Sequence, residues 1–255
     1  MPGPRIVLVR TKDSANVGAA ARAMRNFDLD DLWLVAPRCR IDERARALAS
    51  HAGDLLESAR VVETLDEALV GITLVAGTSA RPRRASSYAV SGPREAAPRL
   101  VSGAAVLFGP EDHGLANEEL TRSQLHVVVP TAEFSSLNLA QAVLVVAYEA
   151  HLARLDDGFT SGDGGVESPP LAGRTGEAPA ARDQLEAFYG QFGDTLLRIG
   201  FTDPPRLPSV MRMFRAVFDR AELSAHELAA LRGLASQVRW AADQPPEASP
   251  PAEPD

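Results

Sequence analysis

Five short runs of Val, Ile, Leu and Ala recur along the first half of the chain, and they constrain its fold more than any other feature. Each run is too short for a buried helix and is typical of a strand buried on both faces. Segments with helical spacing of apolar residues separate the runs, so strands and helices alternate. The runs are residues 6–9, 32–35, 72–76, 104–108 and 125–129. This alternation predicts an α/β domain with a mainly parallel sheet and helices on both faces.

The helical segments of this region are short, apart from the last one. We expect helices at 17–27, 41–49, 65–70, 93–101 and 118–123, with Thr64 and Glu67 spaced as a capping box. Residues 139–155 form a longer pattern that is apolar almost all round. Such a helix packs against a sheet or a partner subunit.

Beyond residue 156 the chain has no apolar runs of the strand type. Residues 157–180 are rich in Gly, Pro, Ser and acids and lack periodicity, which is typical of a flexible linker. Three helical patterns follow at 182–199, 208–220 and 225–241, the last preceded by a Ser224 and Glu227 capping box. We therefore expect an α/β domain at 1–156, a linker at 157–180, a helical extension at 181–242 and a disordered tail at 243–255.

Composition narrows the classes of function. The 255 residues carry a net charge of −8, which argues against a protein that coats nucleic acid through bulk charge. Local basic groups remain possible partners for phosphates, notably Arg81, Arg83 and Arg84. The chain has one cysteine, Cys39, and its five histidines show no close pairing, so we expect no metal site. The absence of a long apolar run predicts no membrane span and a cytoplasmic protein.

Three polar loops stand out because each follows an apolar run, where parallel sheets bind ligands. The first contains Asn16 and Arg22, the second contains Gly109 and Glu111, and the third begins the long helix at 136–138. Taken one at a time, these loops have ordinary explanations, such as a helix cap and a surface arginine.

Taken together and in this order, the loops resemble the three signature motifs of the SpoU branch of the SPOUT methyltransferases. The wider sequence is similar to the TrmJ-type tRNA 2′-O-methyltransferases, through the segments DDLWLVAPR, LDEALVGITLVAGTSARPR and EFSSLNLAQAVLVVAYE. The second motif reads Phe-Gly-x-Glu-x-x-Gly-Leu, as at 108–115. The residues that match the other two motifs are Asn16, Gly18 and Arg22, and then Ser136, Leu137, Asn138, Ala142, Tyr148 and Glu149.

The resemblance implies an activity and a fold. It implies S-adenosylmethionine as cofactor and tRNA as substrate, with methylation of the ribose 2′-hydroxyl of a cytidine or uridine at position 32 of the anticodon loop. It also implies a trefoil knot in the C-terminal part of the sheet domain and a homodimer in which one subunit completes the pocket of the other. A deep knot is a rare exception to the usual rules of chain topology.

The resemblance further implies roles for individual residues. Arg22 is expected to act in catalysis, either as the base for the hydroxyl proton or as a clamp for the adjacent phosphate. Arg81, Arg83 and Arg84 are expected to bind tRNA phosphates. The other expected catalytic residues are Asn16, Glu111, Ser136 and Asn138. The expected cofactor-binding residues are Thr78, Ser79, Ala80, Gly109, Val129, Ser136, Leu137 and Asn138.

Several alternatives stay open. The same knot supports base methylation, although the Asn16 and Arg22 motif favours ribose methylation. The target could be another tRNA or rRNA nucleotide. A non-catalytic RNA-binding protein on this fold would tolerate loss of Arg22, Glu111 or Asn138, and all three are present. The helical extension could bind either RNA or the partner subunit.

Overall fold

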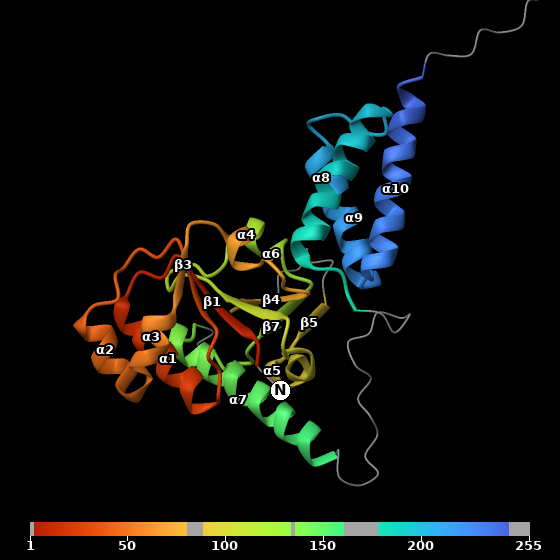
Figure 1. Ribbon diagram of the computed structural model, residues 1–255. Helices are drawn as coiled ribbons and strands as arrows, with labels where there is room; N and C mark the ends of the chain where they lie inside the picture. The colour runs from red at the N-terminus through yellow and green to blue at the C-terminus, as the bar shows by residue number, and fades with distance from the viewer. Residues whose placement is uncertain (1–2, 81–88, 134–135, 161–177, 245–255) are drawn as a thin grey trace, which may run out of the picture.

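The computed structural model describes residues 3–80, 89–133, 136–160 and 178–244 (Figure 1). An α/β domain ends with the long helix α7 (Leu139–Thr160), which extends past the boundary expected at residue 156. A three-helix domain lies to one side of it. The segment with Arg81, Arg83 and Arg84 lies outside the described residues, as do most of the predicted linker and tail. No helix in the described ranges has the length and apolar character needed to cross a membrane.

In the described part of the chain, seven strands form one sheet in the order β3-β2-β1-β6-β4-β7-β5, and every neighbouring pair is parallel. All five predicted strands are present, and the parallel α/β fold is confirmed. The two strands that the sequence analysis missed lie at the edges and have three residues each, too few to show a pattern. The strands are β1 (Arg5–Val9), β2 (Leu32–Val35), β3 (Arg60–Val62), β4 (Leu74–Ser79), β5 (Ala89–Ser91), β6 (Ala104–Phe108) and β7 (Leu125–Val128).

Hydrophobic cores cover both faces of the sheet because side chains alternate along each strand. In β1, Ile6 and Leu8 enter one core, whereas Val7 and Val9 enter the other. The larger core lies under α7 and the helices α1 (Ser14–Asn26), α2 (Glu43–Ala49), α3 (Gly53–Ser58) and α5 (Pro93–Ala96). The smaller core lies under α4 (Leu65–Ala68) and α6 (Asn117–Leu120). Short 3₁₀ turns extend α2 and α5 at Ser50–Ala52 and Ala97–Arg99.

Helix α1 follows β1 after the short loop at residues 10–13 and carries the first motif. The Asp13 side chain caps this helix by accepting a hydrogen bond from the Ala15 N–H at 3.0 Å. Gly18 faces helix α2, and a Cβ atom on it would lie 2.1 Å from the Ala45 carbonyl oxygen. The missing side chain therefore allows two helix backbones to meet, which fixes α1 beside α2.

The second domain consists of α8 (Arg182–Arg198), α9 (Leu207–Ala221) and α10 (Ala225–Ala242), as predicted. Its core contains Phe188 and Tyr189, both at most 1% exposed. Phe188 makes an edge-on contact with Phe218, with ring centroids 5.3 Å apart. The predicted capping boxes at Thr64 and Ser224 are both formed.

A charge cluster inside the helical domain also contacts the α/β domain. The side chain of Arg182, only 1% exposed, forms ion pairs of 2.9 Å with both Asp219 and Glu186. Arg122 of the α/β domain reaches the same Glu186 at 2.5 Å. The backbone also crosses the boundary, since the Arg182 N–H donates to the Ile72 carbonyl oxygen at 2.6 Å.

The two carboxylates of this cluster respond differently to their surroundings. Burial raises the pKa of Asp219, although Arg182 and Tyr189 oppose that effect. Burial also acts to raise the pKa of Glu186, but the hydrogen bond from Arg215 and the nearby guanidinium charges outweigh it and the pKa is lowered. Glu186 is therefore held as an anion among arginines.

Replacing Arg182 with Met should destabilise the protein strongly. The substitution leaves the buried Asp219 carboxylate without its main counter-charge, which typically costs about 3–5 kcal/mol of unfolding free energy. Urea unfolding followed by circular dichroism measures this loss. The control is Arg198→Met, because the Arg198 pair with Asp243 is exposed to solvent and should contribute little. Equal losses in the two variants would contradict a structural role for the buried cluster.

Candidate functional site

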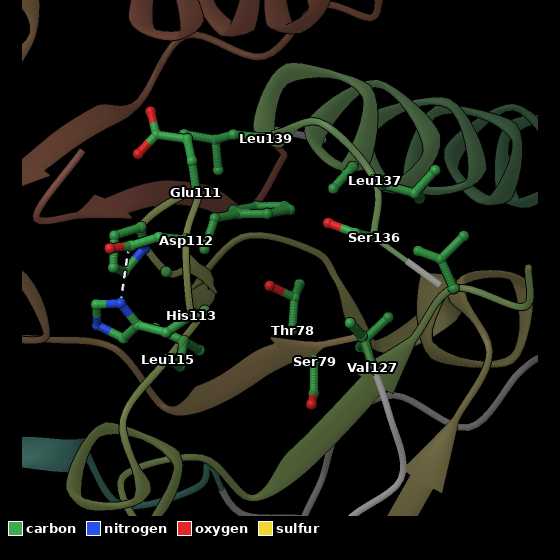
Figure 2. A pocket seen from close by; sticks show the side chains of 17 residues that line it. Thr78, Ser79, Glu111, Asp112, His113, Leu115, Val127, Ser136, Leu137 and Leu139 are labelled. Atoms are coloured by element: carbon green, nitrogen blue, oxygen red, sulfur yellow. Dashed lines mark ion pairs between the residues drawn. The ribbon is translucent and has the colours of Figure 1, made fainter. Parts of the chain in front are cut away.

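A cavity of about 650 Å³ opens at the carboxyl ends of β4, β6 and β7, beside the start of α7 (Figure 2). This is the edge at which parallel sheets bind ligands, and the volume suits a ligand of nucleotide size. The lining combines hydroxyl and carboxylate groups with aliphatic side chains. It comprises Thr78, Ser79, Ala80, Phe108, Gly109, Pro110, Glu111, Asp112, His113, Gly114, Leu115, Val127, Val129, Ser136, Leu137, Leu139 and Ala142.

The end of β4 provides one wall of the cavity. Thr78 and Ser79 are the last residues of this strand and are half-buried. The Thr78 hydroxyl donates to the Leu107 carbonyl oxygen at 2.8 Å, which ties β4 to the neighbouring β6. The hydroxyl thus has a fixed direction at the edge of the cavity.

The loop after β6 folds back tightly on itself. The Gly114 N–H donates to the Pro110 carbonyl oxygen at 2.9 Å, and Gly114 has a φ of +68°, a conformation that favours glycine. A Cβ atom on Gly109 would lie 2.1 Å from backbone atoms of Gly114 and Leu115. Glycine at 109 is therefore required for this loop to close.

Hydrogen bonds join the three motif loops through Asn16. Its side-chain N–H donates to the Glu111 carboxylate at 2.8 Å, and its carbonyl oxygen accepts from the Asn138 side chain at 2.8 Å. Asn138 in turn accepts from the Ala140 N–H at 2.9 Å, in the first turn of α7. Asn16 is only 9% exposed, so both of its polar ends need these partners.

Glu111 is held as an anion at the rim of the cavity. Burial acts to raise its pKa, but the hydrogen bonds from Asn16 and from the Lys12 and Asp13 N–H groups outweigh burial and lower the pKa. In Figure 2 its carboxylate points away from Thr78 and Ser79. These contacts give Glu111 a positioning role between loops.

An ion-pair cluster forms the outer part of the rim. Asp112 is paired with Lys12 and also with His113, whose Nδ1 lies 2.7 Å from the carboxylate (Figure 2). The hydrogen bond from Lys12 is the largest effect on the pKa of Asp112, which is lowered. Lys12 therefore neutralises the charge of Asp112 at the rim.

The structure brings most of the expected cofactor residues to this cavity. Seven of the eight line it, whereas Asn138 lies behind it in contact with Asn16. Glu111 and Ser136 are the only expected catalytic residues among the lining residues. Arg22 is exposed on α1 and has no ion pair or hydrogen bond with any other described residue. The predicted RNA-binding arginines, Arg81, Arg83 and Arg84, lie outside the described residues.

Several lining residues were not among those expected to bind the cofactor. Asp112, His113 and Leu115 belong to the loop that carries the second motif, so their position in that loop was the available signal. Val127 lies within β7, and Ala142 lies one turn into α7. Ala142 matched the third motif in the sequence, whereas nothing in the local sequence distinguishes Val127 from a core residue.

The lining fits the S-adenosylmethionine expected from the sequence. Leu115, Val127 and Leu137 give the cavity apolar surface that would suit a purine ring, and glycine at 109 leaves room for close approach. Thr78, Ser79 and Ser136 add hydroxyl groups to the lining, which would suit the polar parts of the cofactor.

Comparison with known proteins gives consistent results across the chain. Residues 3–148 match the SpoU rRNA Methylase family, and residues 183–247 match the C-terminal domain of the tRNA methyltransferase TrmJ. A tRNA (cytidine/uridine-2′-O-)-methyltransferase TrmJ from Cronobacter sakazakii is 41% identical over 251 residues, covering 95% of this chain and 98% of the relative.

Two solved structures agree with this match. The crystal structure of TrmJ from Z. mobilis ZM4 has a TM-score of 0.77 and 36% identity, covering 92% of this chain and 98% of that one. A probable methylase family protein from Haemophilus influenzae Rd KW20 has a TM-score of 0.60 and 35% identity, covering 95% and 98%.

Replacing Gly109 with Ala should weaken binding of S-adenosylmethionine by at least about tenfold. The added Cβ collides with backbone atoms, so the loop must open and its neighbours leave the cavity wall. Isothermal titration calorimetry measures the affinity, and thermal melting shows whether the variant stays folded. Gly92→Ala is the matched control, since nothing lies within 4 Å of its added Cβ atom. Equal affinities in the two variants would contradict the role assigned to Gly109.

Proposed function

This chain belongs to the SpoU methylase family and carries a TrmJ-type C-terminal domain, and from this we propose that it methylates tRNA. The reaction is transfer of a methyl group from S-adenosylmethionine to the ribose 2′-hydroxyl of a cytidine or uridine. The similarity to TrmJ enzymes over 95% of the chain supports this substrate class. The observation that carries the proposal is the joining of all three motif loops by Asn16 beside a nucleotide-sized cavity.

The residues of the chain contribute mainly by positioning. When bound, the cofactor supplies an electrophilic methyl group, so the protein must align the 2′-oxygen with it. Correct alignment can supply up to about 7–11 kcal/mol of the barrier. Thr78, Ser79, Gly109 and Leu137 would hold the cofactor. Asn16, Glu111 and Asn138 hold these walls in place and are positioning residues.

The proposed target is nucleotide 32 of the anticodon loop, as expected from the sequence resemblance. Arg81, Arg83 and Arg84 follow the cofactor residues of β4 directly and are proposed to bind phosphates near this target. The trefoil knot expected for the family and a cytoplasmic location, where tRNA is modified, belong to the same proposal.

A second subunit is proposed to bring Arg22 to the cavity. Arg22 does not line the cavity of its own chain, although the family motif includes it. Helix α7, which packs beside α1, exposes Leu144 and Tyr148 one turn apart, with exposed fractions of 39% and 44%. An apolar strip of this kind suits the interface of a symmetric dimer.

The direct test is methylation of a tRNA transcript set with labelled S-adenosylmethionine, followed by nucleoside mass spectrometry and mapping. We expect a 2′-O-methylated pyrimidine at position 32. A 2′-O-methyl group elsewhere would leave the reaction standing and reassign the nucleotide. A methylated base would favour the alternative reaction class, and the absence of any methylation would favour an RNA-binding protein.

Arg22→Lys distinguishes the two roles proposed for Arg22. A guanidinium binds a phosphate through two parallel hydrogen bonds, and an ammonium group lacks this geometry. If Arg22 is a clamp, the variant should lose about 100-fold or more in kcat/KM, because Lys keeps only the charge. Single-turnover methylation measures this. Near-full activity in the Lys variant would contradict the clamp.

Mixed dimers should recover activity that neither parent has. Arg22→Ala removes the arginine, and Val129→Trp fills the cavity, so each homodimer should be inactive. Co-expression with two affinity tags gives a mixture in which half of the dimers are mixed and each has one intact site. We expect about a quarter of wild-type activity. A mixture as inactive as its parents would show that Arg22 serves the cavity of its own chain.

A further inference from the structure

Two arginines on the loop between β2 and α2 have no counter-charge in the described part of the chain. Arg38 and Arg40 are exposed, and neither forms an ion pair with another described residue. Cys39 between them is half-buried and packs against the larger core. Because Cys39 turns inward, the residues on either side of it turn toward solvent.

The neighbouring cationic side chains, unlike Arg38 and Arg40, form ion pairs with carboxylates. Lys12 is paired with Asp112, Arg10 with Glu119, and Arg44 with Asp13 at 3.2 Å. The protein as a whole carries a net charge of −8, so carboxylates are abundant. The nearest carboxylates on this side are engaged elsewhere, since Asp42 caps α2 and Asp13 pairs with Arg44. Arg38 and Arg40, two residues apart, are therefore available to bind an anion.

The position of this loop connects it to the cavity. The sheet order places β2 next to β1 and β1 next to β6, so the loops after these strands lie side by side at the carboxyl edge. Neighbouring strands lie about 4.8 Å apart, which puts the Arg38 loop about 10 Å from the loop of Glu111. The Arg38 N–H donates to the Thr11 carbonyl oxygen at 2.9 Å. This hydrogen bond joins the loop after β2 to the loop after β1.

A second observation agrees with this proximity. Burial raises the pKa of the Cys39 thiol, and the Glu111 charge is the next largest contribution. The loop that carries both arginines is therefore close enough to the rim of the cavity for its groups to interact electrostatically with that rim.

We propose that Arg38 and Arg40 bind backbone phosphates of the tRNA strand beside the nucleotide that is methylated. Guanidinium groups match phosphate geometry, and phosphate contacts fix the register of a nucleic acid without reading its sequence. The two arginines would thus help to set which ribose reaches the cavity. This inference rests on the proposed function, because it requires a tRNA substrate.

The test uses the full chain with Arg38→Gln, Arg40→Gln and the double variant. Log affinity falls as log salt concentration rises, and each lost phosphate contact should make this slope shallower by about 0.7–0.9. In the double variant the slope should therefore be shallower by about 1.4–1.8. The KM for tRNA should rise about tenfold in the double variant while kcat at saturating tRNA stays near wild type. Fluorescence anisotropy across a salt series and steady-state methylation measure these quantities.

Arg60→Gln is the matched control for the single variants. It removes the same charge from an exposed position in the same domain, but Arg60 begins β3 and lies at the opposite, amino edge of the sheet. Its salt slope and KM should equal those of wild type. Calorimetric affinity for S-adenosylmethionine should be unchanged in all of these variants.

The outcomes separate the two proposals. If wild type methylates tRNA but the double variant keeps the wild-type salt slope and KM, the phosphate contacts are wrong and the proposed function stands. A double variant that loses cofactor affinity or kcat with unchanged KM would also overturn the inference, because the loop would then support the cavity. If wild type neither binds nor methylates tRNA, the proposed function itself fails.

Discussion

The side chain of Asn16 is the constraint on which the site depends. One amide group joins Glu111, which is 95 residues away in the sequence, to Asn138, which is 122 residues away. Because the amide is buried, loss of either partner would leave a polar group unsatisfied, at a cost of about 1–3 kcal/mol. The three motif loops are therefore held together beside the cavity.

Two glycines allow the close packing around the Asn16 hydrogen bonds. Gly18 lets α1 approach α2, which fixes the direction of the helix that begins near Asn16. Gly109 lets the loop after β6 close on itself, which fixes Glu111 at the rim. In both places a side chain would collide with backbone atoms, which cannot move aside as a flexible side chain could.

Most charged side chains described above form ion pairs, but a few exposed arginines do not. In the helical domain, buried Arg182 pairs with Glu186 and Asp219, and Arg122 of the α/β domain connects to the same Glu186 across the boundary. At the carboxyl edge of the sheet, Lys12 and Arg10 are paired, whereas Arg38 and Arg40 are not. The paired charges hold the architecture, and the unpaired ones are available to a polyanion.

The sequence by itself determined the central strands, the parallel sheet and the residues of the cavity that belong to motifs. These follow from local patterns: apolar runs at β1 and β6, and polar loops directly after strands. It did not determine the edge strands β3 and β5, because three residues carry no periodicity. Only the tertiary structure decided that Asn16 pairs with Glu111 and Asn138, that Val127 faces the cavity, and that Arg122 pairs with Glu186 across the domain boundary. Each of these depends on which distant segments the sheet order brings together, and that order is set by the packing of the whole chain.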